Sequence, residues 1–168
     1  EGGSYMAYCR GMLKRNETIP AIPGWAIFDQ QYMDTYMLAG TMPGRPKPER
    51  WYREGYLKKA GDIAGLASKI DVDPIVLSDT LVRFNQFVDD DRDTDFNRGD
   101  RAYDRWLGDP LHRPSETLGS INKAPFYAIE VVPGDVGTFG GVLTDEFARV
   151  LRDDGSVIAG LYATGVAT

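Results

Sequence analysis

Residues 73–88 read DPIVLSDTLVRFNQFV, and this stretch decides the fold of the chain's larger part. Asp73 followed by Pro74 is typical of a helix start, because aspartate caps the first turn and proline fits the first helical position. The apolar residues that follow fall at steps of four, three and four, and so share one helix face: Leu77, Leu81, Phe84 and Val88. The spacing therefore predicts a helix with this stripe buried.

The sequence before this helix alternates strand, loop and helix signals. Residues 24–29, GWAIFD, predict a buried strand, and residues 56–60 predict a second short strand. Between them, the prolines and glycines of residues 40–54 predict a loop that cannot sustain a helix. Asp62 is expected to cap a helix that runs through about residue 70. Residues 1–20 fit either a short helix or a loop.

An acidic run follows the long helix, over residues 89–104. Its aspartates alternate at 91, 93 and 95, as they do in a calcium-binding loop. The EF-hand spacing also requires a glycine and a glutamate at the positions that Phe96 and Ala102 occupy, so the motif fails. The charge run therefore predicts a solvated loop. Residues 105–122 carry further prolines and glycines and read as irregular.

From residue 125 onward the pattern is that of β structure. Residues 126–132 predict a strand, and the turn signal DDG at 153–155 predicts a hairpin between 147–151 and 156–158. A last short strand is expected at 161–164. The elements together predict an α+β fold, with a mixed part over 1–124 and a β-rich segment over 125–168.

Composition limits the classes of protein that this chain can belong to. Its 168 residues are 42% hydrophobic and 26% charged, which suits a globular protein, and no run approaches the roughly 20 apolar residues of a membrane span. The net charge of −6 argues against non-specific nucleic-acid binding. One cysteine forms no internal disulfide, and with one histidine it forms no zinc cluster, so we expect no metal and a reduced, cytoplasmic setting.

The common catalytic motifs are absent from the sequence. His112 lies in a proline-rich loop and is expected to be exposed, and Cys9 has no activating neighbour. There is no P-loop, and the glycines of residues 137–141 do not form the GxGxxG fingerprint. The strand and glycine turn of residues 160–168 normally lead into a helix or a ligand loop. We therefore expect a fragment of a larger protein, whose other parts would hold most of any dinucleotide.

Four stretches of the sequence resemble one enzyme family. They are PFYAIEVVPGDVGTFGG at 125–141, DDGSVIAGLYATG at 153–165, PGWAIFD at 23–29 and DFNRG at 95–99. They are similar to the flavin-dependent 3-ketosteroid 1-dehydrogenases, and the resemblance extends over most of the chain. The glycine turns alone are shared by the wider flavoprotein group that includes soluble fumarate reductases.

This resemblance implies a domain organisation. In the family, an α+β catalytic (cap) domain interrupts a Rossmann-type FAD domain, to which the chain then returns. Residues 1–124 would form the catalytic domain and residues 125–168 the truncated start of the returning segment. The family's dinucleotide fingerprint and its later Tyr-x-Gly-x-Gly motif are both absent. The chain would thus need the remainder of the same polypeptide, and alone it is expected to be inactive.

The resemblance also implies an oxidoreductase reaction and its residues. The family introduces a C1–C2 double bond into 3-ketosteroids: FAD accepts a hydride, a tyrosine takes a proton, and an artificial or respiratory acceptor reoxidises the flavin. Tyr5 resembles the catalytic base, with Tyr8 as its rival. The other implied positions are Tyr8, Thr138 and Phe139 for the substrate and Gly140, Gly141, Gly165 and Val166 for the cofactor. A phenol can act as a base only where its pKa falls.

Three alternatives remain open at this point. A fumarate-reductase-like flavoprotein would act on a small unsaturated carboxylate, but it would need arginine and histidine clamps, for which the sequence has no motif. Desaturation of a 3-ketosteroid at C4–C5 is chemically close to the 1-dehydrogenation. A non-enzymatic α+β binding module would need a complete fold within these residues.

Overall fold

The computed structural model describes residues 4–134, 137 and 140–168. The chain divides into two compact units, Glu1–Pro133 and Gly134–Thr168. Within the described residues, no helix combines the length and the apolar character that crossing a membrane requires.

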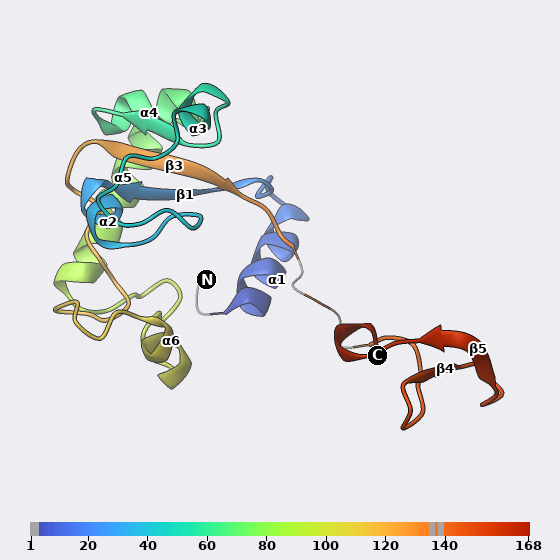
Figure 1. Ribbon diagram of the computed structural model, residues 1–168. Helices are drawn as coiled ribbons and strands as arrows, with labels where there is room; N and C mark the ends of the chain where they lie inside the picture. Colours follow the sequence, from blue (N-terminus) through green and yellow to red (C-terminus); the bar gives the residue numbers. More distant parts are fainter. Residues whose placement is uncertain (1–3, 135–136, 138–139) are drawn as a thin grey trace. The chain divides into compact units, whose positions relative to one another are not determined.

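The first unit is built on a three-stranded antiparallel sheet in the order β1-β3-β2, of which Figure 1 shows β1 and β3 lying side by side. Strand β1 (Gly24–Asp29) pairs along its whole length with β3 (Phe126–Val131), and β2 (Lys58–Ala60) pairs with the other edge of β3. The two strands expected at 24–29 and 126–132 are thus confirmed. They pair across nearly the full length of the unit, a non-local contact that no spacing along the sequence reveals.

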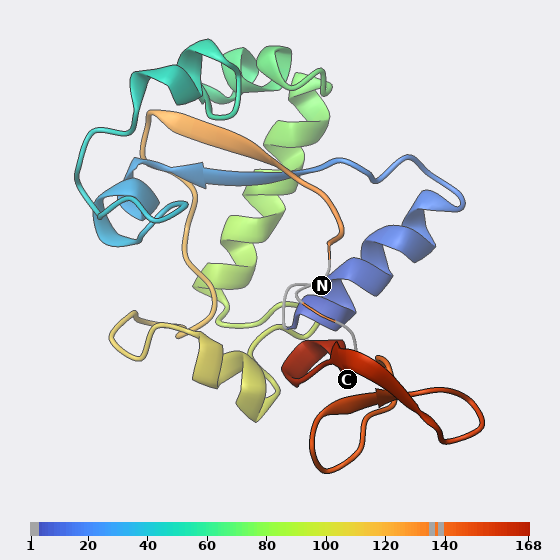
Figure 2. The same cartoon turned by 45° about the vertical axis from the view of Figure 1, so that its right-hand side comes forward.

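Helices α4 (Ile63–Lys69) and α5 (Pro74–Asp89) cover one face of this sheet, and Figure 2 shows α5 crossing behind β1 and β3. Both expected caps are present: Asp62 Oδ1 accepts the Gly65 N–H at 2.7 Å, and Asp73 Oδ1 accepts the Ile75 N–H at 2.8 Å. The stripe is buried at Leu77, Leu81 and Val88 and half-buried at Phe84. The core on this face comprises Ala60, Leu66, Ala67, Ile70, Leu77, Leu81, Phe126 and Ala128.

The opposite face of the sheet carries a second, smaller core. Helices α2 (Gln30–Thr35) and α3 (Glu49–Arg53) lie on this side, and the core comprises Phe28, Met33, Leu38, Leu57 and Tyr127. Alternate residues of β1 and β3 supply the two faces, as a pleated strand requires. Helix α3 corrects the expectation of a helix-free loop over 40–54, because the last proline of that run, Pro48, is the residue before the helix starts.

Two further helices complete the first unit. Helix α1 (Tyr5–Asn16) decides between the alternatives left for residues 1–20, and Ser4 Oγ caps it by accepting the Ala7 N–H at 3.1 Å. Helix α6 (Ala102–Leu107) overlaps the run expected to be a solvated loop. That expectation fails in part, because Asp93 and Asp104 are 6% and 7% exposed and accept backbone N–H groups of the turns around them.

The second unit is a small hairpin. Strand β4 (Arg149–Leu151) pairs antiparallel with β5 (Val157–Tyr162), and a 3₁₀ turn, η1 (Gly165–Ala167), follows. The expected hairpin is confirmed, but β5 is one continuous strand where two short ones were expected. The division between the units falls after Pro133 rather than near residue 125, because β3 belongs to the sheet of the first unit.

Candidate functional site

Tyr5 and Tyr8 lie one turn apart at the start of α1. Tyr5 is the first helical residue and its side chain is 79% exposed, and it is not among the residues that line the cavity described below. Tyr8 is half-buried, and this burial, with a smaller contribution from Cys9, raises the pKa of its phenol. A raised pKa opposes the formation of a phenolate, which counts against Tyr8 as a base.

Two glycines of the second unit, Gly137 and Gly141, pack against the turn that contains the expected flavin contacts Gly165 and Val166. A Cβ built on Gly141 would lie 2.3 Å from the Ala167 carbonyl oxygen, and one built on Gly137 would lie 2.6 Å from Val166 Cγ1. The Val142 N–H donates to the same Ala167 oxygen at 3.0 Å. Bare glycine backbone therefore lies against the turn that contains Gly165 and Val166, an arrangement that a side chain would block.

The two other expected substrate contacts, Thr138 and Phe139, lie outside the described residues.

Gly165 has a φ of +69°, in the left-handed region that favours glycine, at the point where β5 ends and η1 begins. An exposed glycine backbone beside a turn can approach a planar or phosphorylated ligand closely. The described part of this unit thus fits a contribution to a flavin site, within which Gly140, Gly141, Gly165 and Val166 are the candidates.

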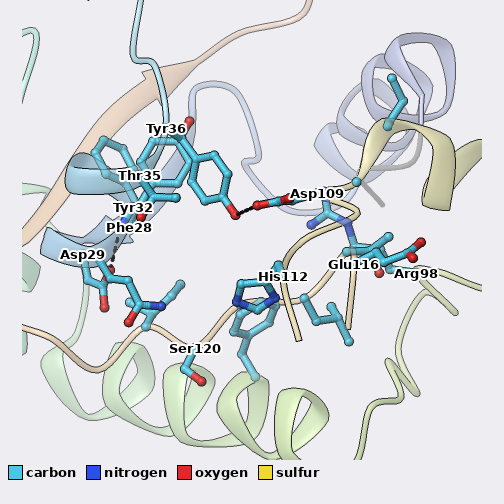
Figure 3. Close-up of a pocket in the computed structure, with 18 of the residues that line it drawn as sticks. Phe28, Asp29, Tyr32, Thr35, Tyr36, Arg98, Asp109, His112, Glu116 and Ser120 are labelled. Atoms are coloured by element: carbon cyan, nitrogen blue, oxygen red, sulfur yellow. Dashed lines mark hydrogen bonds between the residues drawn. The ribbon is translucent and has the colours of Figure 1, made fainter. Parts of the chain in front are cut away.

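The first unit contains a partly open cavity of about 420 Å³ (Figure 3). Its walls come from β1, α2, α5, α6 and the segment 108–121. The Tyr36 phenol reaches from α2 to this segment and donates to Asp109 Oδ2 at 2.7 Å. Burial first, and then this hydrogen bond, raise the pKa of Tyr36 to about 12, while the same bond lowers the pKa of Asp109. Tyr36 is therefore a neutral donor and Asp109 an anion at neutral pH.

His112 also lines this cavity, which corrects the expectation of an exposed loop histidine. It is half-buried, and its Nδ1 lies 2.6 Å from the Ser115 carbonyl oxygen. A carbonyl oxygen only accepts hydrogen bonds, so Nδ1 carries the proton. In the neutral imidazole, Nε2 is then left as the acceptor. No catalytic motif in the sequence pointed to this residue.

Asp29 has a structural role at the edge of the cavity. The side chain is 2% exposed, and its carboxylate accepts three backbone N–H groups, from Tyr32 at 3.1 Å, Asn122 at 3.0 Å and Lys123 at 2.8 Å. It thereby caps α2 and ties the start of that helix to the segment that leads into β3. The resemblance included Asp29 without assigning this function to it.

The sequence did not predict that the residues lining this cavity would lie close together. Tyr36 and Asp109 are separated by 73 positions, and their contact depends on how the segment 108–121 folds back under α2. Of the stretches that carry the resemblance, PGWAIFD and DFNRG supply residues of the cavity wall, namely Ile27, Phe28, Asp29 and Arg98. No spacing of residues along the chain could have joined the others.

Comparison with known proteins identifies close relatives. A family profile described as an FAD binding domain matches residues 1–168. The 3-oxosteroid 1-dehydrogenase of Mycolicibacterium smegmatis is 49% identical over 144 residues, which cover 86% of this chain and 25% of that protein. The enzyme of the same name from Mycobacterium tuberculosis is 46% identical, over 86% of this chain and 26% of its own length.

A solved structure agrees with these relatives. The 3-ketosteroid delta1-dehydrogenase of Sterolibacterium denitrificans, crystallised with 1,4-androstadiene-3,17-dione, matches with a TM-score of 0.77 and 35% identity. The match covers 94% of this chain and 29% of that one. The chain thus spans about a quarter of the length of the curated relatives that it matches.

Proposed function

Because the chain belongs to the FAD binding domain family, we propose that it forms part of an FAD-dependent 3-ketosteroid 1-dehydrogenase. FAD is the cofactor that the family match indicates. The proposed reaction introduces a C1–C2 double bond into a 3-ketosteroid, and a respiratory or artificial acceptor completes the turnover. A cytoplasmic location and a catalytic function for the first unit belong to the same proposal.

The observation that carries the proposal is the 49% identity to a 3-oxosteroid 1-dehydrogenase over 86% of this chain. The match to a structure that holds a steroid dienone supports the same substrate class.

The reaction removes one hydrogen from each of two neighbouring carbons. The hydrogen on C1 leaves with its bonding electrons and the hydrogen on C2 leaves as a proton, so the remaining electron pair forms the double bond. Bound FAD supplies the hydride acceptor. We assign the proton acceptor to the Tyr5 oxygen, since its exposure leaves the phenol accessible, whereas burial raises the pKa of Tyr8.

The residues of this chain that would hold the cofactor lie in the second unit. We assign the flavin contacts to Gly140, Gly141, Gly165 and Val166, where bare backbone lies against the 3₁₀ turn. Tyr8, Thr138 and Phe139 are assigned to the steroid. Side chains added at the close-packed glycine, Gly141, would displace the turn and thereby weaken flavin retention.

The test uses the purified flavoprotein, assayed with 4-androstenedione and an artificial electron acceptor. We expect Tyr5→Phe to lower kcat by about 10²- to 10⁴-fold, the usual contribution of a general base. Flavin absorbance and steroid affinity should stay close to those of the parent protein. Tyr8→Phe is the matched control on the same helix, and it should keep kcat within about tenfold.

Two results would reject parts of the proposal. A Tyr5→Phe variant that turns over at more than about a tenth of the parent rate would exclude Tyr5 as the base. A protein that binds FAD but forms no dienone from any 3-ketosteroid would exclude the substrate class itself.

A further inference from the structure

Ser4 holds the first turn of α1 by two hydrogen bonds. Its backbone is extended, with a φ of −154° and a ψ of 155°, so it precedes the helix as an N-cap residue. Its Oγ accepts the Ala7 N–H at 3.1 Å, and its carbonyl oxygen accepts the Tyr8 N–H at 2.9 Å. The Oγ contact satisfies an N–H group that has no acceptor within the helix, which stabilises the turn that begins at Tyr5.

The later turns of α1 are anchored to the rest of the first unit. Met12 is buried, and a Cβ built on Gly24 would lie 3.3 Å from its Cε, so this side chain packs against the start of β1. Asn16 Oδ1, in the last turn, accepts the Ala21 N–H at 2.9 Å. At the other end of the helix, Tyr5 is 79% exposed. The first turn therefore receives less support from packing, and its order depends more on the cap.

The sequence of the first turn offers no substitute for this cap. Residues 5–8 are Tyr, Met, Ala and Tyr, so this turn, which the structure describes in full, has no acidic side chain to interact with the helix dipole. Forming a helical turn is costly in chain entropy. Loss of the Ser4 Oγ would leave the turn without a side-chain acceptor and would favour its frayed state.

We propose that Ser4 is a positioning residue, which fixes the place of the Tyr5 oxygen through the first turn of α1. Because the Tyr5 side chain is exposed, the backbone of this turn sets where its oxygen lies more than packing does. A general base must lie within hydrogen-bond distance of the proton that it takes, and a misplacement of about 1 Å can cost about 10²-fold in rate. The inference rests on the proposed function of Tyr5 as the base.

The test begins with two variants of the purified flavoprotein, assayed with 4-androstenedione and an artificial electron acceptor. We expect Ser4→Ala to lower kcat by about 3- to 30-fold, since the loss of an N-cap shifts a turn toward its frayed state by up to about that factor. Ser4→Thr keeps a hydroxyl acceptor at the cap and should stay within about twofold of the parent. Flavin absorbance should be unchanged in both variants. A Ser4→Ala variant with the parent kcat, or a Ser4→Thr variant as slow as Ser4→Ala, would overturn the proposal.

A double variant shows whether Ser4 acts through Tyr5. In Tyr5→Phe the phenol oxygen is gone, so the addition of Ser4→Ala should change the residual kcat by less than about twofold. A general effect of the cap on the protein would lower kcat by the same factor in both backgrounds. Equal losses in the two backgrounds would therefore overturn the proposal.

Asp73→Ala is the matched control. It removes the same kind of cap from α5, where Asp73 Oδ1 accepts the Ile75 N–H, and α5 carries none of the proposed catalytic or ligand contacts. This variant should lower the midpoint of thermal unfolding and keep kcat within about twofold. If it lowered kcat as much as Ser4→Ala, the loss would reflect general destabilisation and would contradict a positioning effect.

The same variants separate this inference from the function on which it rests. If Tyr5→Phe keeps the parent kcat, Tyr5 is not the base, and the assignments of Tyr5 and Ser4 fail together. If Tyr5→Phe is slow and Ser4→Ala is not, the assignment of Tyr5 stands and that of Ser4 alone is overturned.

Discussion

The two units of this chain differ in how much of their apolar surface they bury. The first unit packs buried residues on both faces of its sheet, and Leu66 and Ala128 are 0% exposed. Of the described residues after Pro133, Val150 is the one buried apolar side chain. Large apolar side chains of the second unit remain exposed: Val142, Leu143, Phe147, Leu161, Tyr162 and Val166.

This contrast separates a unit that carries its own core from one that does not. A two-stranded hairpin is marginally stable in water unless a further layer covers it. Six large apolar side chains left exposed on so small a unit are more than its own hairpin can cover. The first unit can therefore hold a site by itself, such as the cavity beside Tyr36, whereas the second is expected to contribute to a site that other parts complete.

The largest expected effect is on the isolated second unit. A peptide of residues 134–168 should show no cooperative thermal transition by circular dichroism, because a lone hairpin buries too little apolar area to offset its chain entropy. A peptide of residues 1–133 should unfold cooperatively. A sharp melting transition in the shorter peptide would break the contrast between the two units.

Core truncation should distinguish the units next. Leu66→Ala removes a fully buried side chain from the core against α4 and α5 and should lower the free energy of unfolding by about 2–5 kcal/mol. Urea unfolding followed by tryptophan fluorescence measures this change. Val150→Ala is the matched truncation in the second unit, and the main transition should keep its midpoint. Equal losses in both variants would mean that the two units unfold as one.

Removal of a buried charge should have a smaller effect. Asp29→Asn places an amide donor where a buried carboxylate oxygen accepts the Asn122 and Lys123 N–H groups, so we expect a loss of about 1–3 kcal/mol in the free energy of unfolding. Asp145→Asn is the counterpart in the second unit, where the carboxylate accepts the Phe147 and Arg149 N–H groups. That variant should leave the main urea transition unchanged, and a comparable shift would contradict the division.

The smallest effect is a pH dependence at the cavity. The pKa of Tyr36 rises from 10.0 to about 12 on folding, so its proton is bound more tightly in the folded state. Its contribution to stability is complete below about pH 10 and is lost as the pH rises toward 12. The stability difference between the parent and Tyr36→Phe should therefore shrink across this window in urea titrations. A constant difference would exclude the linkage, and Tyr162→Phe controls for the loss of one phenol.

The pKa of Asp109 changes in the opposite direction. Its carboxylate is stabilised by the Tyr36 phenol, which lowers the pKa, so this contribution is present at neutral pH. It is lost as the pH falls through the folded-state value. In Asp109→Asn, the free energy of unfolding should therefore lose the part of its acid dependence that comes from this carboxylate. Tyr36→Phe should reduce the same part. Additive acid effects of the two variants would show that the pair does not act together.

Local signals predicted much of the secondary structure. Asp62 and Asp73 start helices because a side-chain carboxylate satisfies N–H groups in the first turn, a contact made within three residues. The turn at Asp153–Gly155 could be predicted in the same way, because its conformation depends on only a short run of residues. Helix α6 was missed, because its six residues lack both a capping side chain and a full apolar stripe.

The sequence by itself determined the helices with caps, the strands with aromatic and β-branched residues, the acidic charge and the flavoprotein resemblance. Each of these features depends on residues close together in the chain, or on motifs that can be recognised in the sequence itself. The tertiary structure decided the rest: the pairing of β1 with β3, the boundary after Pro133 and the meeting of Tyr36, Asp104 and Asp109 around one cavity. Those features depend on contacts between distant residues, whose free energy exists only once the chain has folded.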